Sequence, residues 1–282
     1  MAFLFDEAGS SGRGTVSTYI RALDVLDEAI KLGQVDIHAP SVWAIDSPSE
    51  LMLLQKYVLE QQHEYVAGKR GIFAVLHNVG KSYFENRWCS AAVRQLAAFR
   101  QTRIYETGLE GAISSSSIGE EVAEKVRTVK VKTPACFIPD SVDPSSREGK
   151  EAIALAKRRI NQFVFRKWVV GLYRNECCIT GLNVPEVLRA SHIVSWASDK
   201  RNRMNPSNGL CLSATYDAAF DRHLISFDDD YRMILSPRIR DFCTRDICAK
   251  YFLQFEGVRM TLPERFSPDL NLLKKHRALL VS

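Results

Sequence analysis

The chain has 282 residues, of which 46% are hydrophobic, 25% charged and 10% aromatic. This composition excludes a disordered or fibrous protein, and the length favours two domains because single cores usually stop growing at about 250–300 residues. No apolar run approaches the ~20 residues that span a bilayer, and the opening residues lack the apolar core of a secretory signal. We therefore expect a cytoplasmic protein that makes no membrane contact and forms no disulfides.

Helical periodicity dominates the N-terminal part of the chain. Ser47, Pro48 and Glu50 form a capping box, which predicts that a helix begins there. Helices are predicted over residues 15–32, 47–65 and 86–100, and short extended segments over residues 41–45 and 72–76.

Two turn-rich stretches then flank a short alternating segment at residues 122–131. An amphipathic helix is predicted to follow over residues 150–173. The predicted organisation is a mainly helical recognition or regulatory module over residues 1–106, a turn-rich linker region over 107–149 and a second domain over 150–282.

Positive charge is concentrated at the start of this second domain. Residues 151–210 carry ten Lys and Arg against four Asp and Glu, a net charge of +6, whereas the whole chain carries +5. A solvated helix surface would also be rich in Lys and Arg. The same segment, however, holds the densest group of chemically capable side chains, which favours a phosphate backbone as partner.

A strand, a short strand and a helix are predicted next, at residues 187–194, 210–212 and 216–222. His192 lies near the end of the first strand, and Ser213 stands at the N-cap of the helix. Asp217 and Asp221 are one helical turn apart, so they project from one face about 5–6 Å from each other. Either both are solvated surface acids, or a divalent cation between them relieves their repulsion.

This region resembles the HNH endonucleases, whose metal site consists of a strand ending in His, an Asn in the next turn or strand, and a helix with two ligands. Asn208 precedes Asp217 by nine residues and Asp221 by thirteen, which is the spacing of that family. The wider pattern looks like the restriction-endonuclease-type subgroup and extends the resemblance to residues 161–277. It consists of CxITG at 177–181, ASHI at 190–193, NGLxL at 208–212, DxxFD at 217–221, LPxxxxP at 262–268 and LxxHR at 273–277.

The resemblance implies an α+β protein with a C-terminal ββα-metal domain, and it implies a role for each matched residue. His192 looks like the general base, and Asn208 would orient its ring through a hydrogen bond or a backbone contact. Asp217 and Asp221 would hold the metal, with Ser191 as a weak third ligand where many members have His or Asp. Many members also have His in place of Asp217, so this oxygen-rich set favours Mg²⁺ or Mn²⁺ over Zn²⁺.

Three arginines are candidates for DNA binding. Arg189 shares a strand face with Ser191, so it either contacts the scissile phosphate or is an ordinary exposed strand residue. Arg201 and Arg203 lie in the polar loop of residues 197–207, which we expect to face the substrate. The chain has no CxxC pair, so a structural zinc site is not expected, and Cys178 and Cys211 are predicted to be core residues on neighbouring strands.

The sequence thus predicts a metal-dependent endonuclease that cleaves double-stranded DNA and restricts foreign DNA. One alternative is a nuclease effector of a defence system that a ligand or partner activates through residues 1–130. Another is a non-catalytic DNA-binding protein that retains the HNH fold, which the Ser191 departure permits. The sequence leaves open the recognition sequence, the effect of base modification, and whether the chain forms a homodimer.

Overall fold

The structure, a computed structural model, describes residues 13–35, 37–69, 71–76, 79–242 and 246–280. The chain splits into two compact units, and each unit combines separate pieces of the sequence. Unit 1 contains residues 1–105 and 131–157, and unit 2 contains residues 106–130 and 158–282. The opening residues, from which we expect no secretory signal, lie outside the described residues.

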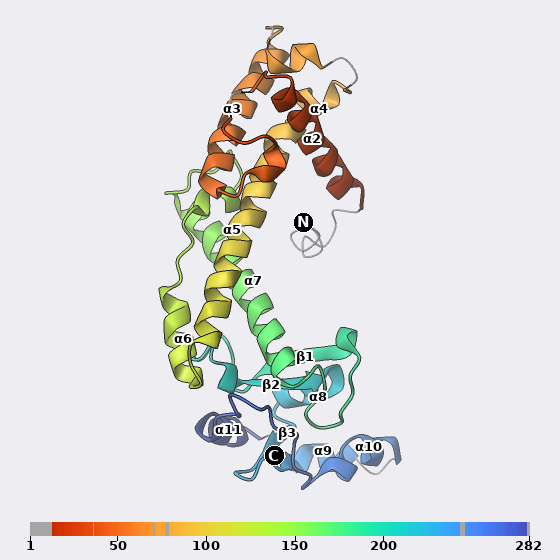
Figure 1. The fold of residues 1–282 in the computed structure, drawn as a ribbon. Helices are drawn as coiled ribbons and strands as arrows, with labels where there is room; N and C mark the ends of the chain where they lie inside the picture. Colours follow the sequence, from red (N-terminus) through yellow and green to blue (C-terminus); the bar gives the residue numbers. More distant parts are fainter. Residues whose placement is uncertain (1–12, 36, 70, 77–78, 243–245, 281–282) are drawn as a thin grey trace. The chain divides into compact units, whose positions relative to one another are not determined.

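Unit 1 is helical, as the periodicity of its sequence predicts (Figure 1). Its elements are α2 (Arg13–Lys31), η1 (Val42–Ala44), α3 (Pro48–Val66), η2 (Ile72–Val75), α4 (Ser82–Glu85), the first part of α5 (Trp88–Ser114), η3 (Pro134–Phe137) and the start of α7 (Arg147–Leu172). The Ser47 side chain accepts a hydrogen bond of 3.2 Å from the Glu50 amide, which confirms the predicted helix start.

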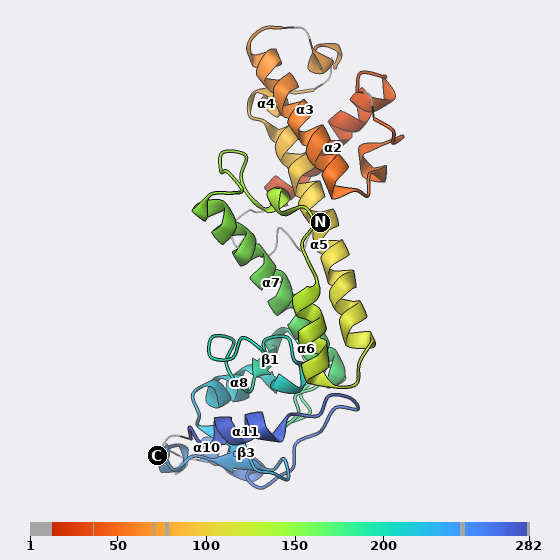
Figure 2. The same cartoon turned by 90° about the vertical axis from the view of Figure 1, so that its left-hand side faces the viewer.

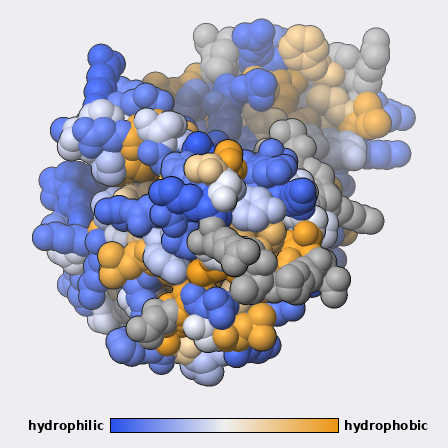
Figure 3. Space-filling view, turned by 90° about the horizontal axis from the view of Figure 1, so that it is seen from above, coloured by the Kyte–Doolittle hydropathy of each residue, from blue (hydrophilic) through white to orange (hydrophobic). Residues whose placement is uncertain are grey.

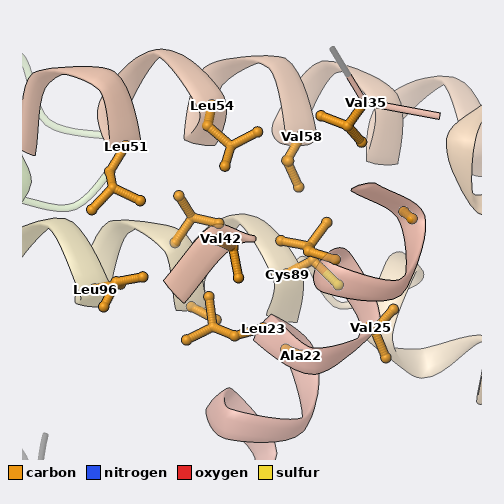
Figure 4. Packing of buried hydrophobic residues seen from close by; sticks show 14 of the residues in the cluster. Ala22, Leu23, Val25, Val35, Val42, Leu51, Leu54, Val58, Cys89 and Leu96 are labelled. Atoms are coloured by element: carbon orange, nitrogen blue, oxygen red, sulfur yellow. The ribbon is translucent and has the colours of Figure 1, made fainter. Parts of the chain in front are cut away.

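The core of unit 1 lies between α2, α3 and α5. Leu51 and Val58 of α3 face Leu23 of α2 and Cys89 and Leu96 of α5, and each is at most 2% exposed (Figure 4). Such apolar packing supplies most of the stability of short helices. Hydrophilic side chains predominate on the face drawn in Figure 3, with smaller apolar groups between them.

The prediction of extended segments at residues 41–45 and 72–76 is wrong, because residues 42–44 and 72–75 form 3₁₀ turns. A short apolar run has too few residues for its periodicity to distinguish a strand from another buried element. A strand without a partner would leave its backbone groups unpaired, whereas the turn pairs them locally. The Ala44 amide, for example, donates to the Ser41 carbonyl oxygen at 3.0 Å.

The region between residues 107 and 130 also differs from its prediction, because it is helical. Helix α5 continues to Ser114, and α6 (Gly119–Thr128) replaces the alternating segment. Val122, Ala123 and Val126 are at most 3% exposed, so burial of one helix face outweighs the turn propensity of the flanking Gly and Ser residues.

Unit 2 combines helices with small antiparallel sheets, which confirms the α+β class (Figure 1). Besides the end of α5, α6 and the rest of α7, it contains η4 (Pro185–Val187), β1 (Leu188–His192), η5 (Pro206–Asn208), β2 (Gly209–Ser213), α8 (Ala214–Asp221), β3 (Ile225–Phe227), β4 (Met233–Leu235), α9 (Pro237–Phe242), α10 (Asp246–Tyr251), η6 (Leu253–Phe255) and α11 (Leu270–Arg277). Within the described residues, no helix has both the length and the apolar character to cross a membrane.

The elements β1, β2 and α8 form a ββα unit (Figure 2). The strands pair antiparallel, from Leu188 opposite Ser213 to His192 opposite Gly209. A Cβ atom at Gly209 would lie 2.4 Å from Val169 Cγ2 and 2.9 Å from Phe165 Cζ. Glycine therefore lets α7 approach the start of β2, beside the end of β1 that carries His192.

Helix α6 packs against η5 and belongs to unit 2 for that reason. A Cβ atom at Gly119 would overlap Asn205 Oδ1, so a larger residue there would displace the Asn205 side chain. The Arg265 guanidinium also donates to the Ser116 carbonyl oxygen at 2.8 Å. Residues 106–130 thus support the loop that precedes β2.

His276 of α11 packs against the end of α8 and hydrogen-bonds to it. Its ring is 3% exposed and stacks on Phe220 with 3.7 Å between ring centroids. Its Nε2 lies 3.0 Å from the Phe220 carbonyl oxygen and 3.1 Å from His223 Nδ1, and Ser226 Oγ lies 3.0 Å from Nδ1. Since the carbonyl can only accept, Nε2 carries the proton and Ser226 donates to Nδ1, which uses both nitrogens of a neutral ring.

We expect His276 to make the stability of unit 2 depend on pH. Burial lowers the pKa of His276 from 6.5 to about 4, so between these values the unfolded chain binds a proton that the folded chain does not. The contribution of the neutral His276 ring to the free energy of unfolding is complete above pH 6.5. It decreases by roughly 3 kcal/mol as the pH falls to about 4. Urea unfolding at several pH values should therefore show a shallower pH dependence for His276→Gln than for the wild type, and parallel curves would contradict the assignment.

Candidate active site

A pocket of about 430 Å³ opens in unit 2 between α7, β1, the loop after β1, and α8. It gathers five of the residues predicted from the sequence. Its lining consists of Gln162, Phe165, Arg166, Arg189, Ala190, Ser191, His192, Ser195, Trp196, Asp217 and Asp221.

His192 ends β1 and is half-buried between two aromatic rings. Phe165 stacks on its imidazole with 3.9 Å between centroids and 11° between planes, and Trp196 meets it edge-on at 5.5 Å. Its Nε2 lies 3.0 Å from the Arg203 carbonyl oxygen. These contacts fix both the plane and the rotation of the ring.

The contacts of His192 also determine where its proton lies. A carbonyl oxygen can only accept, so Nε2 carries hydrogen and the neutral ring keeps an unprotonated Nδ1. Burial lowers the pKa of His192 below 6.5, partly offset by the hydrogen bond to Arg203. At neutral pH the ring is therefore uncharged and able to take up a proton at Nδ1.

Asp217 and Asp221 lie one turn apart on α8, and both line the pocket. Ser191 is 3% exposed, and its hydroxyl donates to Asp217 Oδ1. Partial removal from water and the neighbouring Asp217 carboxylate raise the pKa of Asp221, with Arg222 and His223 acting in the opposite direction. The two acids thus repel each other in the absence of a cation.

The donor set suits a hard divalent cation. Among the described residues there is no group of three or more His, Cys, Asp and Glu that could hold a metal. The pocket offers the carboxylates of Asp217 and Asp221, and the Ser191 hydroxyl lies beside Asp217. Mg²⁺ is commonly held by one or two carboxylates, with water and substrate phosphate as the other ligands. Neutralising the Asp217–Asp221 repulsion would favour binding.

Asn208 does not line the pocket. Its side chain is fully buried, where Oδ1 accepts from the Val194 amide at 2.8 Å and Nδ2 donates to the carbonyl oxygens of Val194 and Asn202 at 3.1 and 3.0 Å. Its own carbonyl oxygen accepts from the Ile193 amide at 2.9 Å. Asn208 therefore contacts the backbone directly after His192 and not the imidazole ring.

Asn208→Ala should destabilise the protein by about 3 kcal/mol, because it leaves one amide and two carbonyl groups, all partly buried, without their partners. The loop that supplies the Arg203 carbonyl would loosen with it. Urea unfolding measures the loss. Asn271→Ala, at an exposed position of α11, should change stability by no more than about 0.5 kcal/mol; equal effects of the two substitutions would contradict the role of Asn208.

Of the three predicted DNA-binding arginines, only Arg189 lines the pocket. The Arg203 guanidinium lies over the Trp196 ring at 5.4 Å, and its Nε donates to the Trp196 carbonyl oxygen at 2.7 Å. Arg203 thus stabilises the loop that contacts the His192 ring. Arg201 is exposed, and its amide donates to Asp199 Oδ1 at 2.9 Å. DNA binding by Arg201 and Arg203 stays a prediction.

The pocket wall formed by α7 was not predicted from the sequence. Gln162, Phe165 and Arg166 stand three and four positions apart, so they share one helix face. The spacing is visible in the sequence, but no local sequence pattern indicates that this helix face lies against β1. Trp196, four residues after His192, was also missed.

The buried cysteines do not resemble reactive or metal-binding thiolates. Cys177, Cys178 and Cys211 are at most 2% exposed, and burial raises the pKa of Cys211 to about 12. The Cys178 amide donates to the Cys211 carbonyl oxygen at 2.8 Å. Cys211 lies in β2, but Cys178 lies in a turn and not in the predicted neighbouring strand.

Comparison with known families confirms the resemblance over the central part of unit 2. Residues 177–228 match the HNH_2 family model, which describes an HNH endonuclease. No curated protein matches the chain. The matched residues include β1, β2 and α8, and with them His192, Asn208 and both pocket carboxylates. This part of the chain is therefore an endonuclease domain of the HNH family.

Proposed function

We propose that the chain is a metal-dependent DNA endonuclease of the cytoplasm that restricts foreign DNA. The observation that carries this proposal is the pocket in which a neutral His192 with an unprotonated Nδ1 and the carboxylates of Asp217 and Asp221 come together. The restriction role rests on the motifs shared with restriction-type HNH proteins.

In the proposed reaction His192 is the general base. Water attacks the phosphorus atom as its proton passes to Nδ1 of His192, and the bond to the 3′ oxygen breaks. The Nε2 hydrogen bond to Arg203 and the stacked Phe165 keep Nδ1 oriented while the ring becomes positively charged. Asp217 and Asp221 would hold Mg²⁺ or Mn²⁺, which when bound stabilises the charge of the pentacovalent phosphate and of the departing oxygen.

Plasmid cleavage by the purified full chain tests this function. We expect cleavage of supercoiled DNA with Mg²⁺ or Mn²⁺ and none with EDTA. Mapping the cut sites on modified and unmodified DNA would then define the specificity. DNA binding without cleavage under any metal would instead support a non-catalytic protein that retains the fold.

A second candidate, a ligand-activated nuclease effector, is favoured by a separate cavity in unit 1. This cavity has a volume of about 390 Å³ and combines an apolar lining with His38 and Glu50. Its size suits a small molecule. Cleavage that appears only after addition of a cell-derived small molecule would favour this candidate, whereas full activity of the purified chain alone would contradict it. Light scattering would show whether either form is a homodimer.

A further inference from the structure

Two arginines of the pocket converge on one backbone oxygen. Arg166 Nη1, from α7, donates to the Leu188 carbonyl oxygen at 2.7 Å, and Arg189 Nη1, from β1, donates to the same oxygen at 2.8 Å. Arg166 Nη2 also donates to the Pro185 carbonyl oxygen at 3.2 Å, and Arg189 Nη1 to that of Glu186 at 2.9 Å. Neighbouring carbonyl groups thus hold two positive charges close together.

Among the described residues, neither guanidinium has a carboxylate within ion-pair distance. Nearby basic residues do have one, since Lys167 pairs with Glu110 and Arg174 pairs with Glu264. A carbonyl oxygen orients a guanidinium but does not neutralise its charge. The acids that line the pocket are Asp217 and Asp221, and the proposed function assigns both to the cation. The positive charge of the two arginines is therefore left for an anion.

We propose that Arg166 and Arg189 form a clamp that binds one phosphodiester group of the DNA. This inference rests on the proposed function and adds to it a residue from outside the matched segment, because Arg166 precedes residues 177–228. Each guanidinium carries five N–H donors, so the backbone contacts leave donors for phosphate oxygens. Two forks from different elements suit a tetrahedral phosphate better than lysine point charges would.

The salt dependence of DNA binding tests the clamp without requiring cleavage. Binding of the full chain to a fluorescent duplex would be measured in the His192→Ala background at several salt concentrations. Arg166→Gln and Arg189→Gln should each weaken binding to all sequences alike and reduce the slope of log K against log salt by no more than about one. The double variant should also lose about one, because both side chains bind the same phosphate.

Two further variants separate phosphate binding from a structural role. Arg240, which pairs with Glu256 outside the pocket, provides the matched control, since Arg240→Gln removes the same charge and should leave the slope unchanged. Arg166→Lys should keep the slope while losing affinity, because it keeps the charge but not the planar fork. A fall in melting temperature of Arg166→Gln with no change in slope would mean that Arg166 only joins α7 to β1, and would overturn the clamp. A slope loss of about two in the double variant would indicate two separate phosphates and would also overturn it.

The outcomes also distinguish the clamp from the nuclease function. DNA binding with the expected slope changes but no cleavage by the otherwise wild-type chain would contradict the nuclease and leave the clamp standing. Cleavage together with unchanged slopes would contradict the clamp alone. Absence of DNA binding would contradict both.

Discussion

Replacing His192 with alanine should reduce the rate of DNA cleavage by at least about 10²–10⁴-fold, the usual contribution of a general base. The variant removes the only imidazole in the lining of the pocket and leaves the proposed phosphate clamp of Arg166 and Arg189 unchanged. Single-turnover cleavage measures the rate, and circular dichroism and DNA binding show whether the variant is folded.

The control for this substitution is His63→Ala, because His63 is exposed on α3 in unit 1. It should cleave like the wild type. The pH dependence provides a second check: the wild-type rate should fall on acidification only below the ordinary histidine pKa of 6.5, since burial lowers the pKa of His192. A His192→Ala variant with near-normal turnover would refute the assignment.

Asp217→Asn and Asp221→Asn should each weaken Mn²⁺ binding at least tenfold, or by about 1.4 kcal/mol, because each removes an anionic ligand from a pair. Metal-dependent cleavage should be lost with it. In metal-free buffer the same changes should raise stability by about 0.2–0.5 kcal/mol, because they remove the repulsion between acids one turn apart.

Calorimetric titration and urea unfolding measure these two opposite effects. Asp230→Asn makes the same change of charge at an exposed residue outside the pocket, and neither quantity should change in that variant. Unchanged Mn²⁺ affinity in both pocket variants would mean that Asp217 and Asp221 are only a solvated helix face.

The parts of the site that were predictable from the sequence lie close together along the chain. The paired strands, the position of His192 at the end of β1 and the two acids on one face of α8 all follow from local periodicity and spacing. Their identification with an HNH domain came from motif resemblance, and the family match confirms it.

The remaining features depend on packing between distant segments, which local patterns do not encode. Phe165, which stacks on His192, comes from the distant helix α7. The proton of His192 is fixed by a hydrogen bond to the backbone carbonyl oxygen of Arg203, and because every residue has such a carbonyl, the sequence does not reveal this partner. Helix α6 was mistaken for an alternating segment because its partner surface, η5, lies far along the sequence.

The interleaving of the two units has a consequence for synthesis on the ribosome. The chain passes between units three times, after residues 105, 130 and 157. Helix α6 therefore emerges long before β1 and β2, and α8 gains the His276 contacts only once α11 has been made. Because units fold as they emerge, at roughly 5–20 residues per second, the pocket should reach its final form only after α11 has been made, although its lining residues end at Asp221.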